Sequence, residues 1–431
     1  MKKIVLLSSL VCILFSNFIY GQENLSHFIE VALQNSPLLK TNGLQTQANQ
    51  LEANKIVASL QKPIIGTSYS YLFAPMYAND PSNTGLKLNP PKTINDYYGY
   101  DLSATNGGLY QALLTIQQPL FNKQRVQAVN SQLAIQNQIV NNSSALSNHD
   151  LEKLVTDQFI ICLQDVEQQK AIQNIQSVIQ KQIKITQKLS AGGIARQGDY
   201  KVLEIELEQQ NTNLQALKNS YKAHILQLYS ICGINDTNIV ALTPLNLQIS
   251  SALNSYQSGF IKQFQLDSLN LAATQNIFNT QYRPIVSLYS SAGLNAVYLP
   301  TIYKRLGWEV GIMVTQKIFD GHQRKMNDEK TKILQQSTAI NSQFFVQKNE
   351  SQKNSLLQVI QSADEQIEAV QKQINDYDTL INYYQTQIIN GQGSVIDYIT
   401  ILRSSAALQL NIATLQTNRL LAINNYNYWN W

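Results

Sequence analysis

The sequence contains the same turn signal twice, first as "SAGGIARQGDYKVL" at residues 190–203 and again as "IINGQGSVIDYITIL" at residues 388–402. In each stretch a glycine precedes an Asp-Tyr pair, and the two aspartates, Asp199 and Asp397, lie 198 positions apart. Glycine favours tight turns, and aspartate is preferred where a helix begins. Ser394, three residues before Asp397, completes the pattern of a capping box. Each stretch therefore predicts a turn that leads into a new helix.

A long helical pattern precedes each turn. Apolar residues recur every three or four positions from about residue 122 to 189, and a second run of this kind extends from residue 321 to 389. A helix of that length is roughly 100 Å long and must pack against partners along its length. A shorter helical run follows each turn. The sequence therefore predicts two helical hairpins, at residues 122–232 (tip 190–199) and 320–431 (tip 388–397).

Alternating segments precede each long helical run, as in "GLYQALLTIQQPLF" at residues 108–121 and "WEVGIMVTQKIF" at residues 308–319. Alternation with a period of two indicates strands whose two faces meet different environments. Runs of about 10 residues can cross an outer membrane as tilted strands, and the sheet of a soluble protein is the alternative. We predict two barrel hairpins, at residues 63–121 (with a long loop at 74–107) and at residues 284–319. The positions predicted to face lipid are Leu114, Ile116, Val310, Ile312 and Val314.

The N-terminus has the pattern of a secretory signal peptide. Residues 1–21, "MKKIVLLSSLVCILFSNFIYG", combine two lysines with an apolar run and end on a small residue. An uncleaved anchor helix or a lipid anchor at Cys12 is the alternative. Without these residues the chain has 30 basic and 28 acidic residues (32 − 2 and 28), a balance that does not favour nucleic acid as a partner. Cys162 and Cys232 are predicted to be buried and unpaired.

Four strands are too few to enclose a lumen, because the smallest outer-membrane barrels have about eight. An open sheet edge leaves backbone groups unsatisfied in lipid, so several chains must contribute to one barrel. A homotrimer supplies three times four strands. We therefore predict a mixed fold: a trimeric 12-stranded outer-membrane β-barrel, continuous with a long periplasmic α-helical barrel and built on an internal two-fold repeat. The other parts are an N-terminal helical segment (22–62) and a connection that contains a helix (233–283).

The chain resembles the TolC-like outer-membrane efflux protein family over nearly all of its mature length. "SHFIEVALQNSPLLK" at residues 26–40 is similar to that family's opening motif, and the strand ends "QQPLF" (117–121) and "TQKIF" (315–319) are similar to its "q.lf.G" motif. The spacing from glycine to aspartate matches at both tips. The resemblance implies a homotrimer in the outer membrane of a Gram-negative bacterium, surrounded by lipid, with a large periplasmic portion. It also implies two protein partners: a periplasmic adaptor (membrane fusion protein) and an inner-membrane transporter of the RND, ABC or MFS type.

The resemblance also implies a gate at the tips. Asp397 matches the position of a constricting acidic ring, and Asp199 is its counterpart in the first tip. Thr400 stands where the family often has a second acid. Ile388 and Gly393 stand where the family has the aromatic and basic partners of a closing latch. That latch is therefore absent, or it is remade with Arg196, Tyr384 or Tyr398. For both aspartates, helix capping is the alternative role.

The tips are also the expected docking surface for the adaptor, with simple turn formation as the alternative role. The docking residues that we predict are Gly193, Ile194, Ala195, Gly391, Gly393, Ser394 and Val395. The sequence contains no nucleophile, metal-ligand or phosphate-binding motif, so we expect no catalytic residue, no cofactor and no metal. The competing interpretation is a secreted or periplasmic coiled-coil structural or adhesin-like protein without a pore, in which the strands would contact no lipid.

Overall fold

The structure is a computed structural model that describes residues 23–73, 77–78, 87–88, 97–98, 108–251 and 258–431. The predicted signal peptide, Cys12 and most of the predicted loop at 74–107 lie outside these residues. The helices are α1 (Leu25–Asn35), α2 (Pro37–Gln61), α3 (Lys123–Ala191), α4 (Gln197–Cys232), α5 (Gly259–Thr280), the 3-10 helix η2 (Leu299–Lys304), α6 (Gln323–Ile389) and α7 (Val395–Trp429). The strands are β1 (Ile64–Phe73), β2 (Tyr77–Ala78), β3 (Lys87–Leu88), β4 (Tyr97–Tyr98), β5 (Gly108–Leu120), β6 (Ile285–Ala296) and β7 (Leu306–Thr315).

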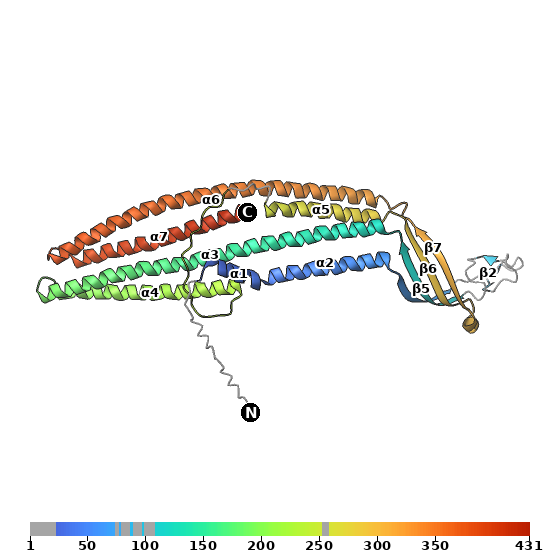
Figure 1. Cartoon of the computed structure of the whole chain (residues 1–431), viewed down its shortest axis with the longest axis horizontal. Helices are drawn as coiled ribbons and strands as arrows, with labels where there is room; N and C mark the ends of the chain where they lie inside the picture. The colour runs from blue at the N-terminus through green and yellow to red at the C-terminus, as the bar shows by residue number, and fades with distance from the viewer. Residues whose placement is uncertain (1–22, 74–76, 79–86, 89–96, 99–107, 252–257) are drawn as a thin grey trace, which may run out of the picture. The chain divides into compact units, whose positions relative to one another are not determined.

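Strands β1, β5, β6 and β7 form one antiparallel sheet in that order (Figure 1). The four predicted strand segments form strands, although β7 ends at Thr315 and the predicted segment extended to residue 319. The two predicted hairpins pair with each other through β5 and β6. The register places Leu114 opposite Ala292, and Ala292 opposite Trp308, so these three residues share one face. The other four positions that we predicted to face lipid lie on that same face: Ile116, Val310, Ile312 and Val314.

The two faces of this sheet differ in polarity. The face that carries Leu114 exposes apolar and aromatic side chains, among them Trp308 (80% exposed) and Ile312 (68% exposed). The opposite face carries mostly small and polar residues: Gly66, Ser68, Ser70, Gln111, Thr115, Gln117, Ser287, Ser291, Gly293 and Asn295. We refer to the two faces as the apolar face and the polar face. Strands β1 and β7 are the edges, and in the described part of the chain neither pairs on its outer side.

Helices α3 and α6 are the long helices that the sequence predicts, with 69 and 67 residues. Each follows a strand after a short segment with left-handed backbone, at Phe121 (φ 57°) before α3 and at Gly321 (φ 65°) before α6. The Asn122 side chain donates a 2.7 Å hydrogen bond to the carbonyl oxygen of Leu60, which ties the start of α3 to the end of α2. No helix in the described residues has an apolar stretch long enough to span a bilayer.

The chain divides into two compact units. The first comprises residues up to 41, 144–261 and 344–431, and it contains both turns between long helices. The second comprises residues 42–143 and 262–343, and it contains the four-stranded sheet. Helices α2, α3, α5 and α6 contribute residues to both units. We describe each unit by itself.

In the first unit, one apolar core joins α1, α3 and α4. Phe28 packs against Phe159 and Tyr229, with ring centroids 6.0 and 6.2 Å away. Cys162 and Cys232 lie in this core, and both are free and buried as predicted. Burial raises the pKa of the Cys162 thiol to about 12, so this side chain behaves as a small apolar residue.

In the second unit, uncharged polar groups connect the helices. The Gln132 side chain donates to Thr274 at 3.0 Å and joins α3 to α5. The Gln335 side chain donates to the carbonyl oxygen of Ser268 at 3.2 Å and joins α5 to α6. Because glutamine, asparagine and threonine provide these contacts, the helices pack with few ion pairs, in keeping with a chain that is only 14% charged.

Candidate functional site

The turns at the ends of the two hairpins have matching backbone geometry. Gly193 and Gly391 both have left-handed backbone, with φ 76° and 71°. In the first turn the N–H of Ile194 donates to the carbonyl oxygen of Leu189 at 2.8 Å. In the second, the N–H of Gln392 donates to Gln387 at 2.9 Å. Both donors and both acceptors are 198 residues apart, so each long helix ends in the same glycine-based C-cap.

The two aspartates lie at the start of the returning helices. The backbone N–H of Arg196 donates to the Asp199 carboxylate at 3.0 Å, so Asp199 satisfies the N-terminus of α4 from inside its first turn. In the second tip the hydroxyl of Ser394 accepts from the backbone N–H of Asp397 at 3.3 Å. The Asp199 carboxylate therefore caps a helix start, which was its alternative role, whereas in the second tip the capping side chain is Ser394 and Asp397 contributes its backbone N–H. Within the described residues neither carboxylate forms an ion pair.

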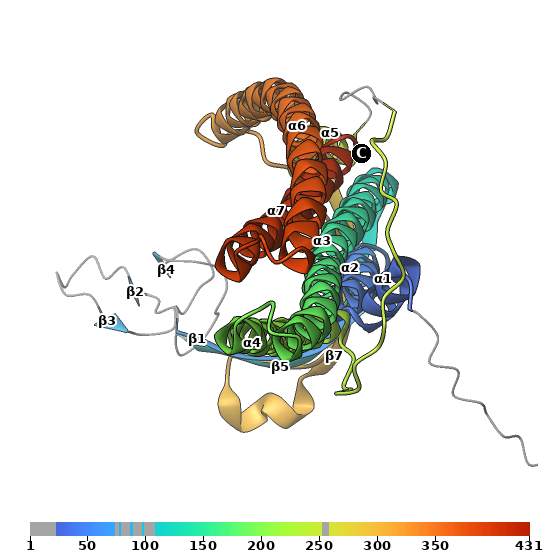
Figure 2. The ribbon, with the colours of Figure 1, turned by 90° about the vertical axis from the view of Figure 1, so that its left-hand side faces the viewer.

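Helices α4 and α7 lie side by side (Figure 2), and the two hairpins share one apolar core behind the turns. Leu203 from the first hairpin is buried together with Tyr398 and Leu402 from the second. Tyr398 is fully buried, and burial raises its pKa to about 12. Its hydroxyl has no hydrogen-bond partner among the residues that the structure describes. Tyr398 is therefore a core residue of the tips and provides no polar latch. Tyr384 packs against the same core.

Close contacts explain two glycines of the second turn. A Cβ atom added to Gly393 would lie 2.7 Å from the backbone nitrogen of Ile388, which is closer than such atoms approach. A Cβ atom added to Gly391 would lie 3.0 Å from Cγ2 of Ile194, so the turns of the two hairpins touch each other. Val395, which we predicted as a docking residue, is buried in the shared core and presents no side chain to a partner.

One ion pair in the described residues connects the hairpins, and it was not among the residues predicted from the sequence. Glu206 of α4 is buried, with 2% of its side chain exposed, and Arg403 of α7 approaches it from the surface. Nη2 and Nε of Arg403 lie 2.6 and 2.8 Å from Oε2 of Glu206, and Gln210 donates to Oε1 at 2.8 Å. The sequence contained a hint of this pair, because Glu206 and Arg403 have opposite charges and lie at similar distances from the two tips. Glu206 is seven residues after Asp199, and Arg403 is six residues after Asp397.

Several residues of the tips remain exposed. They include the predicted gate residues Asp397, Arg196 and Thr400, whereas Asp199 is half-buried. Apolar side chains are exposed beside them at Ile194 and at Ile396, a position absent from our prediction. Exposed apolar residues in contact with polar ones are typical of surfaces that bind another protein. The described residues contain no group of three or more side chains suited to hold a metal ion.

Solved structures of outer-membrane proteins share this fold. CusC, described in terms of transmembrane channel formation, matches with a TM-score of 0.69 and 14% identity over 94% of this chain and 91% of that one. The outer membrane protein VceC of Vibrio cholerae matches with a TM-score of 0.65 and 14% identity over 94% and 96% of the two chains. The CmeC outer membrane channel of Campylobacter jejuni matches with a TM-score of 0.64 and 15% identity over 95% and 86%.

Comparison of the sequences alone gave a different result. No protein-family model and no curated protein matches the chain. The likeness is therefore one of fold, carried by the arrangement of strands and long helices at low sequence identity.

Proposed function

Because the chain has the outer-membrane factor fold, that of the channels named above, we propose that it forms the outer-membrane duct of an efflux or type I secretion system. The observation that carries this proposal is one sheet with an exposed apolar face, connected directly to two long helical hairpins. We place the sheet in the outer membrane of a Gram-negative bacterium and the hairpins in the periplasm. The duct conducts passively and has no catalytic role. The competing coiled-coil interpretation gives the apolar face no function.

The open edges of the sheet support a homotrimer. In lipid, the unpaired N–H and C=O groups of β1 and β7 would cost several kcal/mol each. Pairing β7 of one copy with β1 of the next removes both edges. Three copies of four strands give the 12-stranded barrel that the sequence analysis predicted, with the apolar face toward lipid and the polar face toward the lumen.

Exposed apolar residues on the helices support the same assembly. On α6, Met326, Ile333 and Ile340 recur every seven residues and are all exposed. On α2, Leu44 and Leu51 have the same spacing and are also exposed. A seven-residue repeat is the pattern of helices that pack side by side over a long distance. In the proposed trimer, helices of the adjacent copies cover these residues.

The tips take two roles in this proposal. Three copies of Asp199 and of Asp397 form acidic rings around the periplasmic entrance, with Arg196 and Thr400 beside them, and together they act as the gate. The periplasmic adaptor docks on the exposed and half-buried residues of the turns, and an inner-membrane transporter supplies the cargo. The docking surface that we propose contains these residues: Gly193, Ile194, Ala195, Gly391, Gly393, Ser394 and Ile396. The matching turns support an internal two-fold repeat of one structural plan.

The two faces of strand β5 provide the test. Leu114→Arg places a charge on the apolar face, and Thr115→Arg places the same charge on the polar face one residue away. An arginine facing the middle of a bilayer costs about 2–4 kcal/mol. We expect Leu114→Arg to lower the amount of trimer in outer-membrane fractions severalfold and Thr115→Arg to assemble normally. Equal assembly of the two variants would contradict the membrane placement of the sheet.

A further inference from the structure

The polar face of the sheet carries a single charged side chain within the strands. Among the residues of β1, β5, β6 and β7, only Glu309 is charged at neutral pH. It lies on the opposite face from Trp308 and Val310, its neighbours in β7. The hydroxyl of Ser291 on β6 donates to Oε1 of Glu309 at 2.8 Å. This hydrogen bond holds the carboxylate over β6, and in the described part of the chain Oε2 has no donor.

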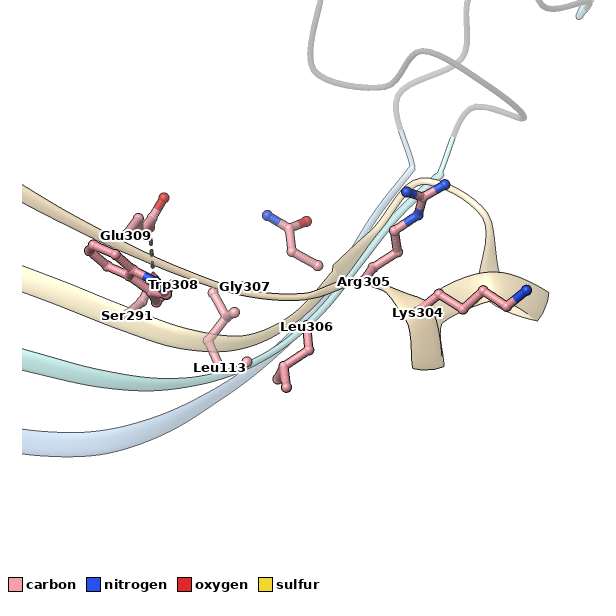
Figure 3. A pocket seen from close by; sticks show the side chains of 10 residues that line it. Leu113, Ser291, Lys304, Arg305, Leu306, Gly307, Trp308 and Glu309 are labelled. Atoms are coloured by element: carbon pink, nitrogen blue, oxygen red, sulfur yellow. Dashed lines mark hydrogen bonds between the residues drawn. The ribbon is translucent and has the colours of Figure 1, made fainter.

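Glu309 lines a cavity of about 350 Å³ beside the edge strand β7, and Leu306 and Trp308 of the apolar face also line it (Figure 3). Leu113, Asn295 and Arg305 line the same cavity. Gly293 and Gly307 are paired across β6 and β7 there, so no side chain fills the space between Glu309 and Arg305. A Cβ atom added to Gly293 would lie 2.2 Å from the carbonyl oxygen of Ala112, so this position requires glycine. The close strand contact keeps the cavity open.

No cation in the described residues neutralises the carboxylate. Arg305 lies four residues along the chain from Glu309, which in a strand is about 13 Å, and the two form no ion pair. Lys304, the other basic residue of the cavity, lies 5.5 Å from the ring centroid of Tyr303 in η2. The cavity therefore presents an exposed negative charge at the end nearer the helices and positive charge at its far end.

We propose that Glu309 is a cation-binding residue that sets the charge preference of the exit path, and that its ligands are organic cations with primary ammonium groups. The inference rests on the proposed function, in which the polar face lines the lumen. Three copies of Glu309 then lie at one level of the barrel. Carboxylates crowded in this way attract cations and repel anions. The amide oxygen of Asn295 and the free Oε2 of Glu309 provide acceptors for an ammonium group.

The test uses the full-length protein in planar lipid bilayers, with spermine as the probe of the acidic ring. Spermine added from the barrel side is expected to block the wild-type channel, and Glu309→Gln to weaken this block at least tenfold. Glu309→Asp keeps the charge and is expected to keep most of the block. Glu368→Gln, which removes an exposed acid from α6 outside the sheet and the tips, is the matched control and is expected to leave the barrel-side block unchanged.

The outcomes separate this inference from the proposed function. If the wild-type protein forms no channel, the proposed function fails and the inference fails with it. If wild-type and Glu309→Gln channels conduct and show the same barrel-side block, the inference is wrong while the duct stands. Arg305→Gln gives a second measurement that leaves the carboxylate and its hydrogen bond intact. It is expected to strengthen the block severalfold, and no change in this variant would also overturn the inference.

Discussion

Loss of Arg403 is expected to loosen the contact between the two hairpin tips. Arg403→Gln removes the guanidinium that lies 2.6 Å from Glu206 and leaves a carboxylate that is 2% exposed with Gln210 as its remaining partner. Breaking a fully buried ion pair costs about 3–5 kcal/mol. Here Arg403 is 63% exposed, so water can reach the position that the guanidinium leaves. We therefore expect a smaller loss, about 2 kcal/mol, which corresponds to about thirtyfold in the opening equilibrium.

Amide hydrogen exchange of the solubilised protein measures this loss locally. In Arg403→Gln, the protected amides of α4 and α7 near Glu206 and Arg403 are expected to exchange about thirtyfold faster, with no change in the sheet. Glu206→Gln removes the buried charge, so adding it to Arg403→Gln is expected to recover much of the protection. Lys201→Gln is the control, because the pair of Lys201 with Glu204 is exposed to water and contributes little to stability. Unchanged exchange in Arg403→Gln, or no recovery in the double variant, would refute the role given to this ion pair.

Two further substitutions test the packing of the tips. Tyr398→Phe removes a buried hydroxyl that has no hydrogen-bond partner in the described residues, so we expect the free energy of unfolding to stay equal or to rise by about 1 kcal/mol. A loss of more than about 1 kcal/mol in thermal unfolding would show that the hydroxyl forms a hydrogen bond. Gly391→Ala forces a left-handed backbone on an alanine beside Ile194, so we expect it to destabilise the tip by about 1–2 kcal/mol. Gly198→Ala is the control, because Gly198 lies inside α4 with open space around it and the change should be neutral or slightly stabilising. Hydrogen exchange of the α7 amides compares the two variants, and equal exchange rates would contradict the turn geometry.

The strands and long helices were predictable because their patterns are local. Alternation in "GLYQALLTIQQPLF" defines the face of Leu114 without knowledge of its neighbours, since the period of a strand is two. The long runs without proline before Gly193 and Gly391 defined α3 and α6 in the same way. The pairing of β5 with β6 could not be predicted from these patterns, because alternation states which face a residue occupies and leaves the partner strand undefined.

The candidate site was less accessible to sequence reasoning. The glycine and aspartate positions were found because the same spacing occurs twice. The burial of Val395 and Tyr398 depends on contact with the other hairpin, and nothing in their own helix distinguishes them from the exposed Ile396. The Glu206–Arg403 pair joins residues 197 positions apart, a separation at which charge patterns along one helix carry no information.

The matching backbone of the two turns affects how many copies of a partner protein can bind. Their side chains differ, since Ile194 and Ala195 of the first turn correspond to Gln392 and Gly393 of the second. On the proposed trimer, a partner protein that recognises the backbone would find six equivalent binding positions, and one that recognises the side chains would find three. The mass of the intact complex would therefore show whether the bound protein recognises the backbone or the side chains of the turns.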